Sequence, residues 1–306
     1  MSSPSALARY QGCLLGLACG DAVGTTVEFM ARGSFPPVTD MTGGGPFSLR
    51  AGEWTDDTSM ALCLAHSLVY RNGFHAVDQM NRYCNWWHYG YMSSTGECFD
   101  IGATVAAALK RYLDTQDPFA GATDPNSAGN GALMRLAPIA MFYAQRDADL
   151  FTFASDSTRT THGAREAIEC SRLFALQLQA ALRGAPKAAL LVQDYPEPLS
   201  EKLLPLAQGA YRGKPEAAIR GSGYCVASLE AALWCFDQTD TFEAAILKAA
   251  NLGDDADTTA AICGQIAGAH YGIAAIPAHW VSQLAMRDEI MALADALFTH
   301  AQLPNQ

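Results

Sequence analysis

Two short acidic clusters, residues 55–58 and 254–258, hold the side chains of this sequence that are best suited to act together in chemistry. They read Thr-Asp-Asp-Thr and Asp-Asp-Ala-Asp-Thr, and each stands where an apolar segment with helical spacing begins. Clustered carboxylate and hydroxyl oxygens, with no histidine or cysteine beside them, favour a hard cation such as Mg²⁺ or Mn²⁺. If the two clusters meet in space, they favour a pair of such ions.

Helix capping is the other interpretation of each cluster. Asp and Thr are favoured N-cap residues, and acids in a first helical turn complement the helix dipole. A cap needs only one side chain, however, whereas Asp56 and Asp57 are adjacent, and Asp254 and Asp255 crowd Asp257. The residues alone leave both interpretations open.

The segments around the clusters have helical periodicity almost throughout. The chain has 306 residues, of which 50% are apolar and 17% are charged, so it can bury a large core. Apolar residues recur at three- and four-residue spacing at Leu7, Tyr10, Leu14 and Leu17, at Ala61, Leu64, Ala65 and Leu68, and at Ile262, Ile266, Ala269 and Ile273. Residues 36–54 indicate an irregular loop, and Gly73 and Gly272 stand where helices should end. We predict an all-α, single-domain globular multi-helix bundle over residues 1–306.

Composition excludes several classes of protein. The formal net charge of −11 disfavours general nucleic-acid binding and attraction to anionic membranes. The nine cysteines form no C-x-x-C pair, which favours reduced thiols and a cytoplasmic location. No signal peptide is evident and no apolar run is long enough for membrane insertion.

Four motifs give the sequence a resemblance to a known family. They are Gly16-Leu17-Ala18-Cys19-Gly20-Asp21-Ala22-Val23-Gly24-Thr25-Thr26-Val27-Glu28-Phe29, Thr55-Asp56-Asp57-Thr58, Gly129-Asn130-Gly131-Ala132-Leu133-Met134-Arg135 and Gly253-Asp254-Asp255-Ala256-Asp257-Thr258. In this order they resemble the ADP-ribosylglycohydrolase family, and within it the dinitrogenase reductase-activating glycohydrolase branch. The resemblance implies an all-α fold, two divalent cations, Mg²⁺ or Mn²⁺, and hydrolysis of the bond that joins ADP-ribose to a modified side chain.

The resemblance also implies a set of metal ligands. One cation would be held by Thr55, Asp56 and Asp57, the other by Asp255 and Thr258, with Asp257 shared between them. Asp254 occupies a position that is often Gly in relatives, so we expect it to support or cap rather than to bind a cation.

Two further acids are candidate catalytic residues. Glu28 would ordinarily be a surface acid and Asp100 an N-cap, but the resemblance implies that Glu28 faces the metal pair and that Asp100 contacts the ribose or the arginine end of the substrate. Relatives often read Asp-x-Gly-Asn-Thr at the positions of residues 100–104, whereas this chain has Ala103 in place of Asn.

Six residues are candidate substrate-binding residues: Ser127, Gly129, Asn130, Gly131, His162 and Tyr224. Gly129-Asn130-Gly131 is expected to open a helix and to cradle the diphosphate with its backbone N–H groups, although such a tripeptide is often only a turn. His162 is either structural or a substrate ligand. Tyr224 either stacks on adenine or belongs to the core.

The predicted activity is removal of ADP-ribose from mono-ADP-ribosylated protein side chains, most plausibly arginine, with ADP-ribose as product. An alternative keeps the site and changes the substrate to O-linked ADP-ribose (serine or O-acetyl-ADP-ribose) or to ADP-ribosylated nucleobases. A further alternative is a non-catalytic protein that binds ADP-ribose or blocks an ADP-ribosyltransferase, as an immunity protein would.

Overall fold

The structure is a computed structural model that describes residues 3–303. These residues contain fourteen α-helices, four short 3₁₀-helices and three isolated β-bridges, with no extended sheet, so the all-α prediction is confirmed. The α-helices are α1 Ala6–Gly24, α2 Asp56–Arg71, α3 Ala76–Tyr89, α4 Ala103–Thr115, α5 Ala137–Phe142, α6 Asp147–Arg159, α7 Arg165–Leu182, α8 Lys187–Leu190, α9 Leu203–Ala207, α10 Cys225–Asp237, α11 Phe242–Ala250, α12 Ala256–Tyr271, α13 Ala278–Gln283 and α14 Arg287–Ala301. The 3₁₀-helices are η1 Thr25–Val27, η2 Pro125–Ser127, η3 Glu216–Ala218 and η4 Ile273–Ala275.

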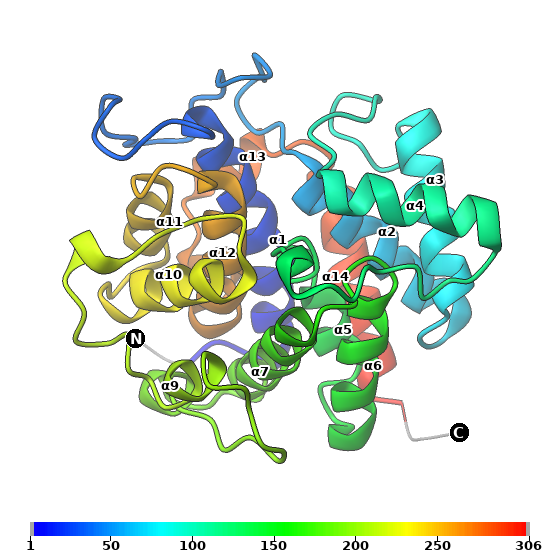
Figure 1. Cartoon of the computed structure of the whole chain (residues 1–306). Helices are drawn as coiled ribbons and strands as arrows, with labels where there is room; N and C mark the ends of the chain where they lie inside the picture. Colours follow the sequence, from blue (N-terminus) through cyan, green and yellow to red (C-terminus); the bar gives the residue numbers. More distant parts are fainter. Residues whose placement is uncertain (1–2, 304–306) are drawn as a thin grey trace.

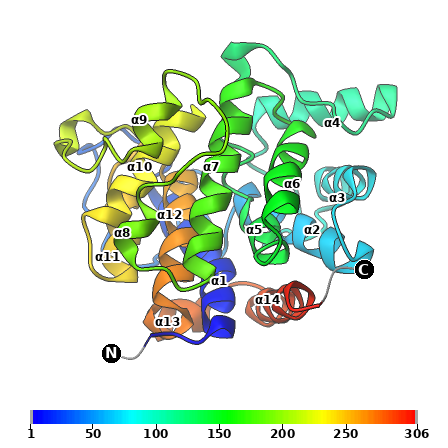
Figure 2. The same ribbon diagram turned by 90° about the horizontal axis from the view of Figure 1, so that it is seen from below.

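Helices α1 and α12 form the centre of the molecule and lie side by side (Figure 1, Figure 2). Helices α10 and α11 pack on one flank of this pair, and α2, α5 and α14 pack on the other. Almost every residue of α1 from Tyr10 onward is buried, as is every residue of α12 up to Ala269. Surrounding helices therefore cover this central pair on all sides.

A stripe of glycines lets α1 and α12 touch backbone to backbone. Gly12, Gly16, Gly20 and Gly24 of α1 face Gly268, Gly264, Ala260 and Ala256 of α12, respectively. A Cβ added to Gly16 would lie 2.3 Å from the carbonyl oxygen of Gly264, and one added to Gly264 would lie 2.0 Å from the carbonyl oxygen of Gly16. The pairing is antiparallel, so the C-terminal end of α1 lies beside the N-terminal end of α12.

A second, smaller hydrophobic cluster joins α2 to α3 and α4. It includes Met60, Tyr83, Trp86 and Leu109, all of which are buried. This cluster packs α3 against both α2 and α4, and the first residues of α2 and α4 line the same cavity.

The predicted loop and one predicted helix end agree with the structure. No helix occurs between η1 and α2, and Gly272 ends α12 with a φ of 75°. The prediction for Gly73 is wrong by one residue, because Asn72 ends α2 in the left-handed conformation, which asparagine tolerates. All nine cysteines are free thiols. Across residues 3–303, the helices are either too short or too polar to cross a membrane.

We expect Gly16→Ala to lower the free energy of unfolding by about 1–3 kcal/mol, because its methyl group cannot fit against the backbone of α12. Urea denaturation measures the change. Gly213→Ala is the control, since a Cβ there meets no atom within 4 Å. Equal unfolding midpoints for the two variants would contradict the backbone contact.

Candidate active site

The start of α2 is capped by a residue from another helix. Thr55 is the N-cap by position, but its side chain makes no capping hydrogen bond. Asp21 of α1 performs this function: its Oδ1 accepts from the backbone N (2.9 Å) and Oγ1 (2.9 Å) of Thr55, and its Oδ2 accepts from the backbone N (3.0 Å) and Oγ1 (2.6 Å) of Thr58. Asp21 is not among the site residues predicted from the sequence. The available signal was a lone acid within the apolar segment 13–23.

Since Asp21 caps α2, the carboxylates of Asp56 and Asp57 are free to face the start of α12. Thr258 Oγ1 donates to Asp57 Oδ1 at 3.2 Å, and Thr55 Oγ1 lies 3.3 Å from Asp257 Oδ2. Carboxylate oxygens of Asp56, Asp57 and Asp257 lie within 4.8 Å of one another. The two acidic clusters therefore meet, as the first interpretation of their sequences predicted.

The start of α12 also lacks a side-chain cap. Asp255 is its N-cap by position, without a capping hydrogen bond. The Oδ2 of Asp255 instead accepts a hydrogen bond from Asn130 Nδ2 at 2.8 Å. Capping therefore does not explain the carboxylates of either cluster.

Glu28 reaches the same point from the end of η1. It is only 4% exposed, so the surface interpretation is wrong. The following residues are tied to the second cluster, because Phe29 N donates to Asp254 O (2.8 Å) and Asp254 N donates to Met30 O (2.7 Å). Both Phe29 and Asp254 have left-handed backbones, with φ of 64° and 59°. Asp254 thus supports the turn that carries Glu28, through its backbone.

Asp100 completes the group of acids. Its φ is 59°, and Gly102 rather than Asp100 is the N-cap of α4, so the capping interpretation is wrong. Carboxylate oxygens of Glu28, Asp100 and Asp257 lie within 4.8 Å of one another.

A cavity of about 360 Å³ is lined by Glu28, Asp56, Asp100, Asp255 and Asp257, whereas Asp57 is buried and forms no part of its wall. Its wall also includes Ala103, Gly129, Asn130, Gly131 and His162. An adjoining cavity of about 500 Å³ shares Gly129 with the first and is lined by Ser127 and Tyr224. Tyr224 is partly exposed, and its hydroxyl contacts Glu166 Oε2 (2.5 Å) and Lys202 Nζ (3.1 Å). Every predicted substrate residue therefore lies on one of two connected cavities.

The expectation that Gly129-Asn130-Gly131 opens a helix is wrong. Residues 131–135 form turns, and α5 begins only at Ala137, with Pro138 in its first turn. Glycine is a poor helix former, whereas proline suits a first turn. The glycines instead make room for an imidazole: a Cβ on either one would lie 3.2 Å from Nε2 of His162.

Burial and mutual repulsion weaken most acids of this site. Burial first, and then Asp100 and Asp255, raise the pKa of Glu28 to about 9. Burial likewise raises the pKa of Asp100 to about 7, and it holds the pKa values of Asp56, Asp57 and Asp257 well above their usual range, with neighbouring carboxylates adding to the effect. Burial also raises the pKa of Asp21 to about 6, although its four hydrogen bonds oppose the shift.

We expect the metal-free protein to lose stability as the pH rises from about 7 to about 9. Across this range the folded state keeps protons on acids such as Glu28, while the same acids in the unfolded chain are fully ionised, so deprotonation favours unfolding. Denaturation at several pH values in EDTA measures the slope. The double variant Asp57→Asn, Asp257→Asn lacks two of these buried acids and should therefore show a shallower slope. Buried thiols contribute equally to both proteins, so they do not affect the comparison. Equal slopes would contradict the prediction.

Known proteins resemble this chain over nearly its full length. The sequence model described as "ADP-ribosylglycohydrolase" matches residues 2–306. ADP-ribosylarginine hydrolase Tri1 of Pseudomonas putida is 44% identical over 301 residues, covering 98% of this chain and 81% of the relative. ADP-ribosyl-[dinitrogen reductase] glycohydrolase of Rhodospirillum rubrum is 32% identical over 309 residues, covering 99% of this chain and all of the relative.

A solved structure gives the same result. The protein titled "ADP-ribosylglycohydrolase-related protein complex" superposes with a TM-score of 0.86 at 46% sequence identity, covering 97% of this chain and 99% of that chain. Fold, sequence and the shared motifs agree: the chain belongs to the ADP-ribosylglycohydrolase family.

Proposed function

We propose that the protein hydrolyses the N-glycosidic bond between ADP-ribose and a modified arginine side chain, with two divalent cations, Mg²⁺ or Mn²⁺, held by Thr55, Asp56, Asp57, Asp255, Asp257 and Thr258. The observation that carries the proposal is the convergence of the two acidic clusters, Glu28 and Asp100 on one cavity. The names of the two relatives support the ADP-ribosyl substrate, and the first supports arginine.

Two buried carboxylate oxygens support the proposal that these residues hold cations. Asp57 Oδ2 and Asp257 Oδ1 are fully buried and have no hydrogen-bond partner among the described residues. A buried carboxylate oxygen without a donor is costly, and a cation bound between the clusters would relieve that cost. Cations held by these residues would orient ribose hydroxyls and would lower the pKa of a water molecule.

Glu28 and Asp100 are suited to move protons. A group with a pKa near 7 exchanges protons readily at neutral pH, and that of Asp100 is about 7. In the net reaction, the oxygen of water bonds to the anomeric carbon of the ribose while the bond from that carbon to the guanidinium nitrogen breaks, and the nitrogen takes a proton. The surrounding carboxylates stabilise the positive charge that develops on the sugar ring.

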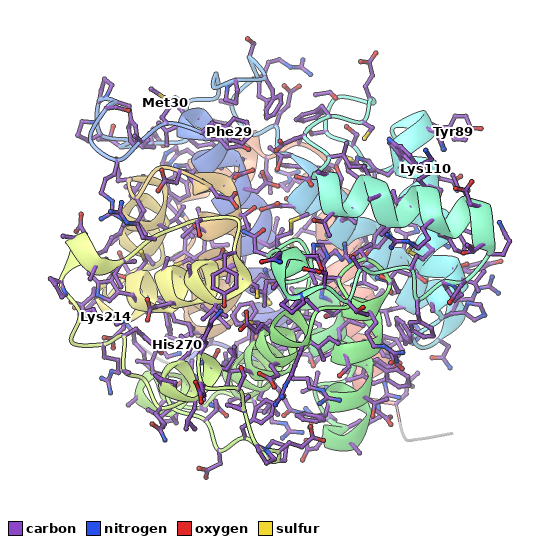
Figure 3. The ribbon with its side chains drawn as sticks, in the orientation of Figure 1. Phe29, Met30, Tyr89, Lys110, Lys214 and His270 are labelled. Carbon is purple, nitrogen blue, oxygen red and sulfur yellow. The ribbon has the colours of Figure 1, made fainter. Side chains whose placement is uncertain are left out.

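An exposed ring on the cavity, together with two neighbouring rings, supports a cationic leaving group. Phe29 lines the cavity and is 69% exposed. Its ring centroid lies 6.4 Å from that of Phe47, which in turn lies 5.2 Å from that of Phe99. Phe29 and its neighbour Met30 project among the surface loops beyond α1 (Figure 3). Aromatic faces attract guanidinium groups, and Glu28 and Asp100 line the same cavity as Phe29.

We expect Asp257→Asn to lower kcat/KM by at least about a thousandfold, or about 4 kcal/mol, and to weaken Mn²⁺ binding in calorimetry. The change removes a charge that both groups of carboxylates share. Asp254→Asn is the matched control: it lies in the same cluster, acts through its backbone, and asparagine tolerates its left-handed φ. Full activity in an Asp57→Asn, Asp257→Asn double variant contradicts the metal-dependent proposal.

We expect arginine-linked ADP-ribose to be cleaved in preference to serine-, acid- and nucleobase-linked conjugates, assayed with Mg²⁺ or Mn²⁺ and with EDTA. Phe29→Leu should raise KM for the arginine conjugate about twofold to fivefold, since it removes a cation–π contact worth about 0.5–1 kcal/mol. Phe29→Tyr should retain the wild-type KM. Preferential cleavage of another conjugate would overturn the arginine assignment while leaving the hydrolase in place.

A further inference from the structure

One cation among the described residues, 3–303, is buried without a carboxylate partner. Arg135 is 1% exposed, and none of the ion pairs formed by residues 3–303 includes it. Its guanidinium carbon lies 4.7 Å from the centroid of the Tyr83 ring, and its Nε has no acceptor. Burying an unpaired charge is expensive, so this residue requires an explanation that packing alone does not provide.

A chain of short hydrogen bonds leads from Arg135 toward the cavity. Arg135 Nη2 donates to Thr161 Oγ1 at 2.6 Å, and Thr161 Oγ1 lies 2.8 Å from His162 Nδ1. Guanidinium only donates, so the Thr161 oxygen accepts from Arg135. The one acceptor that the described contacts leave for the Thr161 hydroxyl proton is His162 Nδ1. The hydroxyl therefore donates to Nδ1, and the imidazole proton is on Nε2.

The other edge of the imidazole faces the ligand space. His162 lines the cavity of about 360 Å³ that holds the acids. Its Nε2 is the atom that a Cβ on Gly129 or Gly131 would approach, and it has no hydrogen-bond partner among the described residues. Burial first, and then the charge of Arg135, lower the pKa of His162 to about 3, which keeps the ring neutral with a single N–H.

We propose that Arg135 and Thr161 are positioning residues that hold His162 as its Nε2-protonated tautomer, so that Nε2–H donates to an oxygen of the bound ADP-ribose beside Gly129 and Gly131. The proposal rests on the proposed function for the identity of the ligand. In this arrangement, the charge of Arg135 polarises the hydrogen-bond chain and favours a ligand oxygen that carries negative charge.

The tautomer is tested by ¹⁵N NMR of the imidazole groups, with the signals of His162 identified by their loss in His162→Asn. We expect a protonated Nε2 and an unprotonated Nδ1 in the wild type. Thr161→Ser keeps the hydroxyl and should keep this spectrum, whereas Thr161→Val, which is similar in shape, should lose it. A protonated Nδ1 in the wild type, or an unchanged spectrum in Thr161→Val, overturns the proposal.

Binding of ADP-ribose is the second readout. By calorimetry, Thr161→Val should raise the Kd about tenfold, the effect of one misaligned hydrogen bond, while Thr161→Ser should stay within about twofold. Binding of Mn²⁺ is the control for folding, because a general loss of structure would weaken it. We expect it to be the same in the wild type, Thr161→Ser and Thr161→Val. Equal ADP-ribose affinity in Thr161→Val and the wild type overturns the proposal. A wild type that binds no ADP-ribose refutes the proposed function instead, and the tautomer spectra still decide the hydrogen-bond chain.

Discussion

The backbone contact between α1 and α12 is the constraint on which the rest of the structure depends. Side chains larger than hydrogen would separate the helices along the glycine stripe. Because the helices are antiparallel, the contact places Asp21, near the end of α1, beside Asp257, near the start of α12. Asp21 then fixes the start of α2 through four hydrogen bonds. Acids about two hundred residues apart in the sequence meet because of this contact.

The gathered acids oppose folding, and several local features offset them. Each carboxyl whose pKa burial raises is less stable as a charge than it would be in water. The N-terminal ends of α2 and α12 carry the positive ends of their dipoles and point at these acids, which lowers the cost. Left-handed backbones at Phe29, Asp100 and Asp254 add strain at the same place. This combination is expected of a site that must be ready for a ligand rather than of a surface optimised for stability.

The sequence predicts those features that depend on local patterns. The helices, the long loop before α2 and the two acidic helix starts all follow from periodicity and composition. The capping of α2 by Asp21 could not be predicted, because it depends on which helix packs beside which. The spacing of Gly12, Gly16, Gly20 and Gly24 indicates a close contact but does not identify the partner. The helix expected at Gly129 is absent for a different reason. Gly129 and Gly131 pack against the ring of His162, a contact that the local sequence pattern does not reveal.

The absence of a helix start at Gly129 changes the electrostatics of this side of the cavity. A helix start at Gly129 would have offered N–H groups and a dipole to an anion. The turn found there does not continue into a helix, because α5 begins only at Ala137. Arg135, buried behind Thr161 and His162, is a positive element on this side, and Lys202 lines the adjoining cavity. The cavity therefore has two electrostatic halves: acids at two helix starts, suited to cations and a polyhydroxyl sugar, and a neutral donor backed by a buried cation, suited to an anionic oxygen. ADP-ribose presents ribose hydroxyls and a diphosphate in the same molecule, which matches both halves.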